Sequence, residues 1–337
     1  MSTNNEARFE EFLGRYDGRD WARAIEALSG SIHEVDRAAT RIWFAFYPLD
    51  LLRALEQAED PEQLAKKLLL QGSYYLKEQV DTSHRFLYGH RYWPEVKKVV
   101  AEQAASFDPA SGGQLAERIM EVAREASKRL KVEEALVVGI SAVALMTVRQ
   151  AGLAAFKAAP GTVSIDKKHL RKSPAQVLAE RAKDDSQGFL GFLKTVDKVW
   201  SVTYDENDEG ARFKVTNGEE LASGAARDNS RDWRSVDPRC IEGPIPVECR
   251  AASCGTCWVG VIGGAEKLSE VNRLEGRMIK EFGYIETDEA RPLIRLACMA
   301  QGGGAVSIVI PPWNGIFGKY LRARRNGETA TQGSAAR

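Results

Sequence analysis

Residues 249–262 read CRAASCGTCWVGVI and contain three of the five cysteines of the chain. These are Cys249, Cys254 and Cys257, and a fourth, Cys298, follows 41 positions after Cys257 in the segment RLACMAQ. The residues between the first three cysteines are mostly Ala, Ser, Gly and Thr, which are small enough for the backbone to wrap closely around a centre and point its N–H groups at sulfur atoms. The stretch therefore predicts a tight loop that gathers thiols, followed by a buried strand.

The composition is that of an ordinary globular protein, with 44% hydrophobic and 28% charged residues among 337. This length has room for two domains of roughly 100–200 residues each. Lys and Arg together number 47, as do Asp and Glu, so the charge balance indicates neither a nucleic-acid partner nor binding to a membrane surface. The opening MSTNNEARFEEF has no basic segment followed by an apolar run. We therefore expect a cytoplasmic protein, in which clustered thiols serve as ligands more often than as disulfides.

Residues 1–196 are predicted to form an all-α domain. Asp60 and Ser173 each precede a proline and carry the side chain of a helix cap, and Gln176 can complete a capping box with Ser173. The apolar segment 135–156 has an uninterrupted run of only 14 apolar or small residues, whereas a membrane-spanning helix needs about 18 or more. It is interpreted as a buried core helix. No known family is recognised in this domain, for which we expect a docking or oligomerisation role.

Residues 197–317 are predicted to form an α+β domain. VWSVTY and ARFKVT flank the acidic turn DENDEG, which indicates a β-hairpin. A short helix, the cysteine loop, the strand WVGVIGG, a helix capped by Ser269 and the closing strand GAVSIVI are expected to follow. Residues 318–337 are first basic and then small and polar, so a flexible basic tail is expected.

The cysteine pattern, C-x4-C-x2-C with a distant fourth cysteine, is the plant-type spacing of ligands to a [2Fe–2S] cluster. The segment 197–317 resembles a [2Fe–2S] ferredoxin domain with the β-grasp fold, and the stretch up to RLACM resembles adrenodoxin-type ferredoxins. The resemblance covers about a third of the chain and implies one-electron transfer, with the cluster bound by Cys249, Cys254, Cys257 and Cys298. Two features depart from the plant type: the gap before Cys298 is wider, and 228–245 is interpreted as an insertion.

Alternatives to the cluster remain open from the residues alone. Four cysteines can hold structural zinc, although such sites usually consist of two close Cys pairs. A disulfide is a further alternative. Cys240, in DPRCIEG, is interpreted as a free thiol in an irregular loop, and its other interpretation is a spare ligand or a redox-sensing thiol.

The predicted function is single-electron transfer by a relay that is not itself an enzyme, because four thiolates leave the irons no open coordination position. Its partners would be a protein electron donor and acceptor, and residues 1–196 would tether it to a larger oxidoreductase assembly, such as a dehydrogenase or hydrogenase, or form a homo-oligomer. One alternative is an enzyme with a second cofactor in the aromatic-rich stretch that contains His84 and His90, where His84, Tyr88 and Arg91 are predicted to lie on one helical face. The other is a redox sensor that responds through the cluster.

Overall fold

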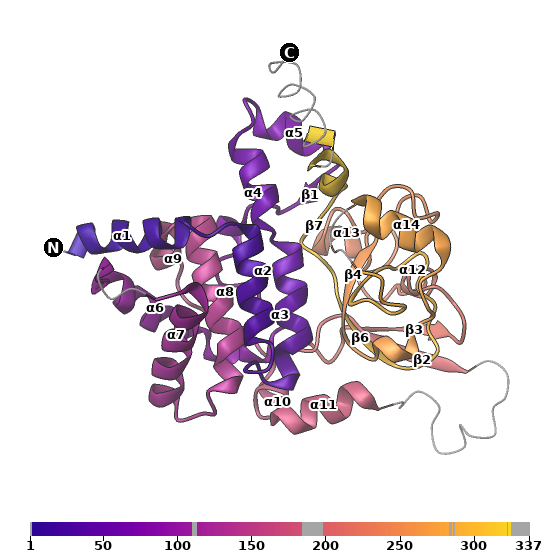
Figure 1. Cartoon of the computed structure of the whole chain (residues 1–337). Coiled ribbons are helices and arrows are strands. Elements are labelled where there is room, and N and C mark those ends of the chain that lie inside the picture. Colours follow the sequence, from indigo (N-terminus) through magenta and orange to yellow (C-terminus); the bar gives the residue numbers. More distant parts are fainter. Residues whose placement is uncertain are drawn as a thin grey trace, which may run out of the picture. The chain divides into compact units, whose positions relative to one another are not determined.

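The computed structural model describes residues 2–109, 113–183, 198–282, 285, 287–321, 323 and 324 (Figure 1). By its contacts the chain divides into two compact units. The helical unit comprises Met1–Leu52, Tyr75–Leu178 and Glu206–Glu209, and the sheet unit comprises Arg53–Tyr74, Ala179–Asp205 and Gly210–Arg337. The boundary predicted after residue 196 lies outside the described residues and stays a prediction. Residues 53–74, which the sequence places with the helical domain, group with the sheet unit.

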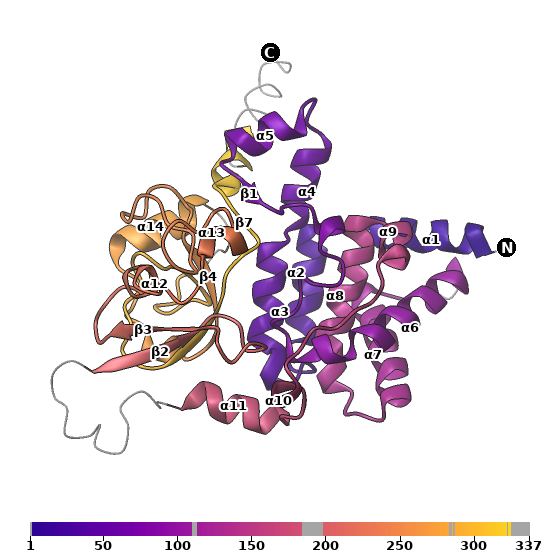
Figure 2. The ribbon, with the colours of Figure 1, turned by 180° about the vertical axis from the view of Figure 1, so that it is seen from behind.

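The helical unit is built around one apolar helix, α8 (Ala135–Ala151), whose residues from Leu136 to Val148 are all buried. It packs against α3, α6 and α7, and both views place it between the α2–α3 pair and the α6–α7 pair (Figure 1 and Figure 2). The predicted core helix is therefore confirmed. Among the described residues, no helix combines the length and apolarity that crossing a bilayer requires. The other helices with residues in this unit are α1 (Ser2–Gly14), α2 (Gly18–Leu28), α3 (Glu34–Phe46), α4 (Leu49–Glu56), α6 (Trp93–Ala105), α7 (Leu115–Leu130), α9 (Leu153–Ala158), α10 (Lys167–Leu170) and α11 (Pro174–Ala182).

Two helix caps predicted from the sequence are present, each at a polar side chain that precedes a proline. The Ser173 hydroxyl accepts a hydrogen bond from the Gln176 N–H at 3.3 Å, and the Gln176 side chain accepts one from the Ser173 N–H at 2.8 Å. This is the predicted capping box at the start of α11. Asp60 likewise caps α5 (Pro61–Lys67) by accepting from the Gln63 N–H at 2.9 Å.

A mixed five-stranded sheet forms the centre of the sheet unit. Its strands are β2 (Val199–Thr203), β3 (Arg212–Thr216), β4 (Trp258–Gly263), β5 (Ile294–Leu296) and β6 (Val306–Val309), in the order β3-β2-β6-β4-β5. The first and last of these strands, β2 and β6, pair in parallel, and every other pair is antiparallel. The predicted hairpin is the β2–β3 pair. The fold is thus α+β, as expected, although β5 was not predicted.

Among the described residues, the helices α12 (Leu221–Ala226), α13 (Trp233–Val236) and α14 (Arg273–Phe282) accompany the sheet. The helix predicted to be capped by Ser269 is α14, and this detail is wrong. The Asn272 side chain accepts from the Glu275 N–H at 2.9 Å and caps the helix, whereas the Ser269 hydroxyl accepts from the Gln301 N–H at 3.1 Å. Ser269 therefore links two loops and does not start the helix.

A second, two-stranded sheet joins residues far apart in the sequence. The strand β1 (Gln71–Gly72) pairs antiparallel with β7 (Trp313–Asn314), and Figure 2 shows β1 close to α5. No strand was predicted before residue 197, so β1 corrects that expectation. Gly72 has φ 70°, and a Cβ atom there would lie 2.4 Å from the Pro312 carbonyl oxygen. Only glycine fits this close approach of the two strands.

Candidate metal centre

The cysteine loop has an unusual backbone. Arg250 and Ala252 are left-handed, with φ of 51° and 57°, although neither is glycine. Alternation of left-handed and ordinary residues turns successive backbone N–H groups toward one side, which forms an anion-binding concavity. The N–H groups of Ala251 and Ser253 accordingly donate to the Cys249 sulfur at 3.4 and 3.3 Å. The loop therefore points backbone donors at a thiol, as its small residues predict.

The structure brings the four predicted cysteines together as two pairs. Cys249 interacts with Cys254 through their side chains, and Cys257 interacts in the same way with Cys298. Electrostatic interactions also link the pairs, between Cys254 and Cys257 and between Cys249 and Cys298. The two pairs thus form one cluster of thiols, in which the cysteine that follows β5 reaches the loop that precedes β4.

The two pairs differ in their exposure to solvent. Cys257 and Cys298 are buried, with 2% and 7% of their surface exposed. Cys249 and Cys254 are half-buried. One side of the thiol cluster is therefore closed by the core of the sheet unit, and the other side lies near solvent.

Hydrogen bonds to sulfur change the acidity of these thiols. Burial raises the pKa of Cys249, but hydrogen bonds from the Ser253 side chain and the Ala251 N–H outweigh it and lower the pKa to about 6. Burial raises the pKa of Cys254, to whose sulfur the Thr256 hydroxyl donates at 3.0 Å. The lowered pKa favours the thiolate form of Cys249, which is the form of cysteine that binds metals.

The buried pair shares a hydrogen bond in which the two thiols have opposite roles. It raises the pKa of Cys257, where burial acts in the same direction, and it lowers the pKa of Cys298. The backbone N–H of Ala252 also lowers the pKa of Cys298. A loop donor therefore reaches the cysteine that comes from the far end of the domain.

A buried ion pair lies next to Cys298. The side chains of Arg295 and Glu275 are both fully buried and are joined by two hydrogen bonds of 2.8 and 2.9 Å. Glu275, on α14, also accepts from the Leu296 N–H at 3.0 Å. Because Arg295 and Leu296 belong to β5, these bonds fix β5 against α14 just before Cys298. This ion pair was not predicted from the sequence, where its signals were Glu275 within an amphipathic helix and Arg295 three positions before Cys298.

The loop is also closely packed at Gly255, which has φ 70°. A Cβ atom at this position would lie 3.0 Å from the Cγ2 atom of Ile316 and 3.4 Å from the Phe282 ring. The ring of Phe282 in turn packs edge-on against Trp258, with centroids 5.7 Å apart. A larger residue than glycine would push the loop away from these neighbours.

Within the described residues, no three or more His, Cys, Asp or Glu side chains are arranged to bind a single metal ion. A mononuclear zinc site would need its ligands to converge on one point. A binuclear iron–sulfur cluster requires two thiolates at each of two irons, which is a different arrangement.

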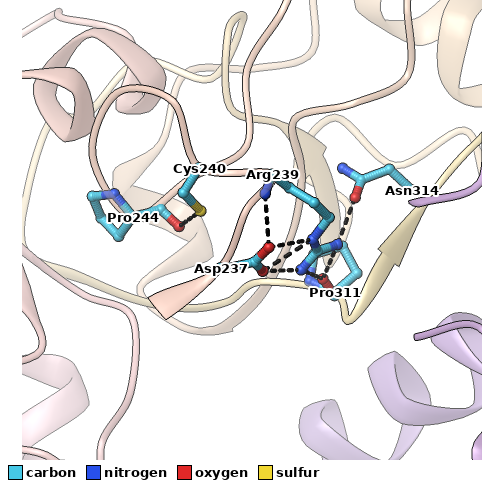
Figure 3. Close-up of polar contacts among 6 residues, drawn as sticks. All are labelled: Asp237, Arg239, Cys240, Pro244, Pro311 and Asn314. Carbon is cyan, nitrogen blue, oxygen red and sulfur yellow. Dashed lines mark hydrogen bonds and ion pairs between the residues drawn. The ribbon is translucent and has the colours of Figure 1, made fainter. Parts of the chain in front are cut away.

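Cys240 is packed separately. Its thiol is 3% exposed and donates to the Pro244 carbonyl oxygen at 3.3 Å (Figure 3). Burial raises its pKa to about 11, and the charges that act on it are those of Asp237 and Arg239. A buried neutral thiol of this kind is unreactive, which agrees with the interpretation of Cys240 as a free thiol.

Next to Cys240, the Arg239 side chain connects two segments of the sheet unit. It donates to both carboxylate oxygens of Asp237, to the Pro311 carbonyl oxygen at 3.2 Å and to Asn314 Oδ1 at 2.7 Å (Figure 3). The segment before the first cysteine is thereby fixed to β7.

The histidines of the helical unit form a buried pair. His84 and His90 are fully buried, and their Nδ1 atoms lie 2.9 Å apart. The His84 ring packs 3.9 Å from the Trp93 ring, and burial lowers the pKa of His90 to about 4. The predicted helical face is wrong, because residues 81–86 form turns that place His84 inside the core. The two neutral rings therefore have the contacts of core residues.

Comparison with known proteins adds no relative. No family model, no curated protein and no solved structure matches the chain.

Proposed function

We propose that the chain is a one-electron carrier that binds one [2Fe–2S] cluster through Cys249, Cys254, Cys257 and Cys298. The observation that carries this proposal is the grouping of these four thiols into two pairs around a loop of backbone donors. Two irons bridged by sulfides need two thiolates each, and their negative charge needs hydrogen-bond donors. The four cysteines would supply the thiolates, and the backbone N–H groups of the loop would supply the hydrogen-bond donors.

The order of the strands supports assignment of the sheet unit to the β-grasp fold of such ferredoxins. Counted along the chain, the five strands lie in the order second, first, fifth, third, fourth, with the first and fifth parallel at the centre. The helix α14 connects the third strand to the fourth and is fixed to it by the Glu275–Arg295 ion pair. This topology places the loop before the third strand beside the residue after the fourth, where the cysteines are.

In this proposal each residue has a defined task. A cluster bound to the four cysteines would supply a site for one reversible electron. The N–H groups of Ala251 and Ser253 and the Thr256 hydroxyl stabilise negative charge on the sulfurs to which they donate. The half-buried pair, Cys249 and Cys254, lies on the side from which an electron enters or leaves. Four thiolate ligands leave no position for a substrate, so the chain acts as a relay.

The helical unit is proposed to tether this relay to a larger oxidoreductase assembly. Positive and negative side chains are equal in number, so the chain lacks the large net charge that would steer it electrostatically toward a partner. Tethering through a separate unit raises the effective concentration of a carrier beside its partner without steering. Co-purification of an oxidoreductase with the full chain is expected, and a full chain that purifies alone and as a monomer would contradict this part.

The cluster itself is tested by chemical analysis of protein purified without oxygen. Two irons and two acid-labile sulfides per chain are expected, together with little zinc. One zinc per chain without sulfide would contradict the proposal. Iron without sulfide would also contradict it, because the bridging sulfides distinguish a cluster from single bound ions.

A further inference from the structure

One hydroxyl beside the thiol cluster has two acceptors within reach. The Oγ1 atom of Thr256 lies 3.0 Å from the Cys254 sulfur and 3.3 Å from Oε2 of Glu248. A threonine hydroxyl carries a single proton, so it donates to only one of these acceptors at a time. Thr256 is 6% exposed, which leaves its hydroxyl little access to water. The sulfur and the carboxylate therefore compete for one donor.

A second contact keeps the carboxylate of Glu248 beside Thr256. Its other oxygen, Oε1, accepts a hydrogen bond from the Gln71 side chain at 3.3 Å. Gln71 lies on β1, 177 positions earlier in the chain, and belongs to the same compact unit as Glu248. Each oxygen of the carboxylate thus faces a donor, one on β1 and the other in the cysteine loop.

The donor can change its acceptor without a change in the backbone. Hydrogen bonds between two oxygen atoms are usually about 2.7–2.8 Å long, so the 3.3 Å contact does not hold the Thr256 hydroxyl tightly. The hydroxyl proton rotates to suit its surroundings. Glu248 is exposed, so its side chain is free of close packing and can approach or leave Thr256.

The choice of acceptor matters for an electron stored at these sulfurs. Hydrogen bonds to the sulfurs stabilise the negative charge that the electron adds. Before the electron arrives, a sulfur bound to iron shares its charge with the metal, so the carboxylate of Glu248 is the stronger acceptor. The Thr256 hydroxyl must then leave Glu248 and turn to Cys254 as the electron arrives. The proton stays on the Thr256 oxygen throughout, and the lost bond to Glu248 opposes reduction.

We propose that Glu248 is a positioning residue that lowers the reduction potential of the site by competing with the Cys254 sulfur for the Thr256 hydroxyl. This inference rests on the proposed function, because the potential is that of the [2Fe–2S] cluster. The direct effect of the Glu248 charge is small, because the side chain is exposed and salt screens exposed charges. Its influence therefore passes through Thr256.

The test compares reduction potentials of the full chain in about 1 M sodium chloride, where the screening length is about 3 Å. Potentiometric titration with dithionite is followed by electron paramagnetic resonance. Glu248→Gln replaces the carboxylate with an amide, which is a weaker acceptor. At a fixed potential we expect the ratio of reduced to oxidised cluster to rise at least fivefold, which is about 40 mV for a one-electron couple.

Glu242→Gln is the matched control for the loss of charge. Glu242 is exposed, as Glu248 is, and its carboxylate accepts a hydrogen bond from Arg250 in the same cysteine loop. The variant therefore removes a charge near the site and leaves the Thr256 hydroxyl with both of its acceptors. It should change the ratio less than twofold.

A double-mutant cycle shows whether the hydroxyl carries the effect. Thr256→Val keeps the shape of the side chain without the hydroxyl, so Glu248→Gln should change the ratio less than twofold in this background. Thr256→Ser keeps the hydroxyl, and in its background the response should again be at least fivefold. An equal response with Val and with Thr at position 256, or an equal response to Glu242→Gln, would overturn the proposal.

Iron and sulfide analysis of every sample separates this inference from the proposed function. Two irons and two sulfides per chain, together with an unchanged potential in Glu248→Gln, would contradict only the role of Glu248. A wild-type chain without iron and sulfide would overturn the proposed electron transfer and this inference with it.

Discussion

The two cysteine pairs reach the same cluster in different ways. Cys249 and Cys254 lie in one loop, remain half-buried and receive backbone donors from their immediate neighbours. Cys257 and Cys298 are 41 positions apart, are buried and meet only because β5 pairs with β4. The first pair is a product of local sequence, and the second is a product of the tertiary fold. Changes to the surroundings of the second pair should therefore affect folding and cluster binding together.

The largest effect is expected from removing a thiol of the buried pair. Cys298→Ser should abolish most of the bound iron and sulfide, because a hydroxyl is a poorer ligand for iron than a thiolate. Iron and sulfide analysis and the visible absorption of the purified protein would measure this loss. Cys240→Ser is the control and should retain both, because the Cys240 thiol donates to Pro244 in a separate site. A Cys240→Ser protein without iron would show that the ligand assignment is wrong.

The next largest effect is a loss of stability, expected when the ion pair beside Cys298 is broken. Glu275→Gln leaves the charge of Arg295 buried without a counter-charge, and breaking a buried pair in this way costs about 3–5 kcal/mol. Denaturant unfolding of the full chain measures the change. Glu270→Gln is the matched control, because Glu270 pairs with Arg291 at 3.2 Å on the surface, where such pairs contribute about 0–1 kcal/mol. Similar losses in the two variants would contradict the positioning of β5 by the buried pair.

A smaller effect is expected in the loop itself. Gly255→Ala introduces a Cβ at φ 70°, which costs about 1–2 kcal/mol, and places it 3.0 Å from Ile316. Gly218→Ala isolates the cost of the left-handed backbone, because Gly218 has φ 80° and no atom lies within 4 Å of the added Cβ. We expect both variants to lose stability to denaturant and only Gly255→Ala to lose bound iron. Equal iron content in the two would show that the Gly255–Ile316 packing does not shape the site.

The smallest effect is expected in the unchanged sequence. It is the difference in reactivity between the Cys249 and Cys240 thiols in protein prepared without iron. The pKa of Cys249 is lowered to about 6 and that of Cys240 is raised to about 11. A thiol becomes a reactive thiolate as the pH rises through its pKa. Iodoacetamide should therefore modify Cys249 increasingly from about pH 5 to 7, while Cys240 stays unmodified. Mass spectrometry of peptides after brief labelling checks this, and faster labelling of Cys240 at pH 7 would contradict it.

Features encoded by neighbouring residues could be predicted from the sequence. The capping side chains of Asp60 and Ser173 each start a helix because they bond to N–H groups three residues away. The β2–β3 hairpin follows from two short runs joined by an acidic turn, the second of which alternates apolar and polar residues. The place of Cys249, Cys254 and Cys257 in one tight loop also follows from their spacing and from the small residues between them. In each case the decisive interactions lie within a few residues.

Features that depend on distant partners could not be predicted. The strand β5 has three residues and is defined by its pairing with β4. The strand β1 has two residues and depends on β7, about 240 positions later in the chain. The ion pair of Glu275 with Arg295 likewise requires α14 and β5 to be placed side by side. Neither charge pattern nor propensity identifies such contacts, because the residues of each partner alone are compatible with a loop or a surface.

The central claim is that four thiols bind one [2Fe–2S] cluster that carries one electron. The most direct test is electron paramagnetic resonance of anaerobically purified full chain before and after reduction with dithionite, with the optical spectrum recorded on the same sample. The prediction is a red-brown protein without haem or flavin bands that bleaches on reduction and gives one unpaired spin per chain. A colourless protein, or a coloured one in which reduction produces no such spin, would contradict it.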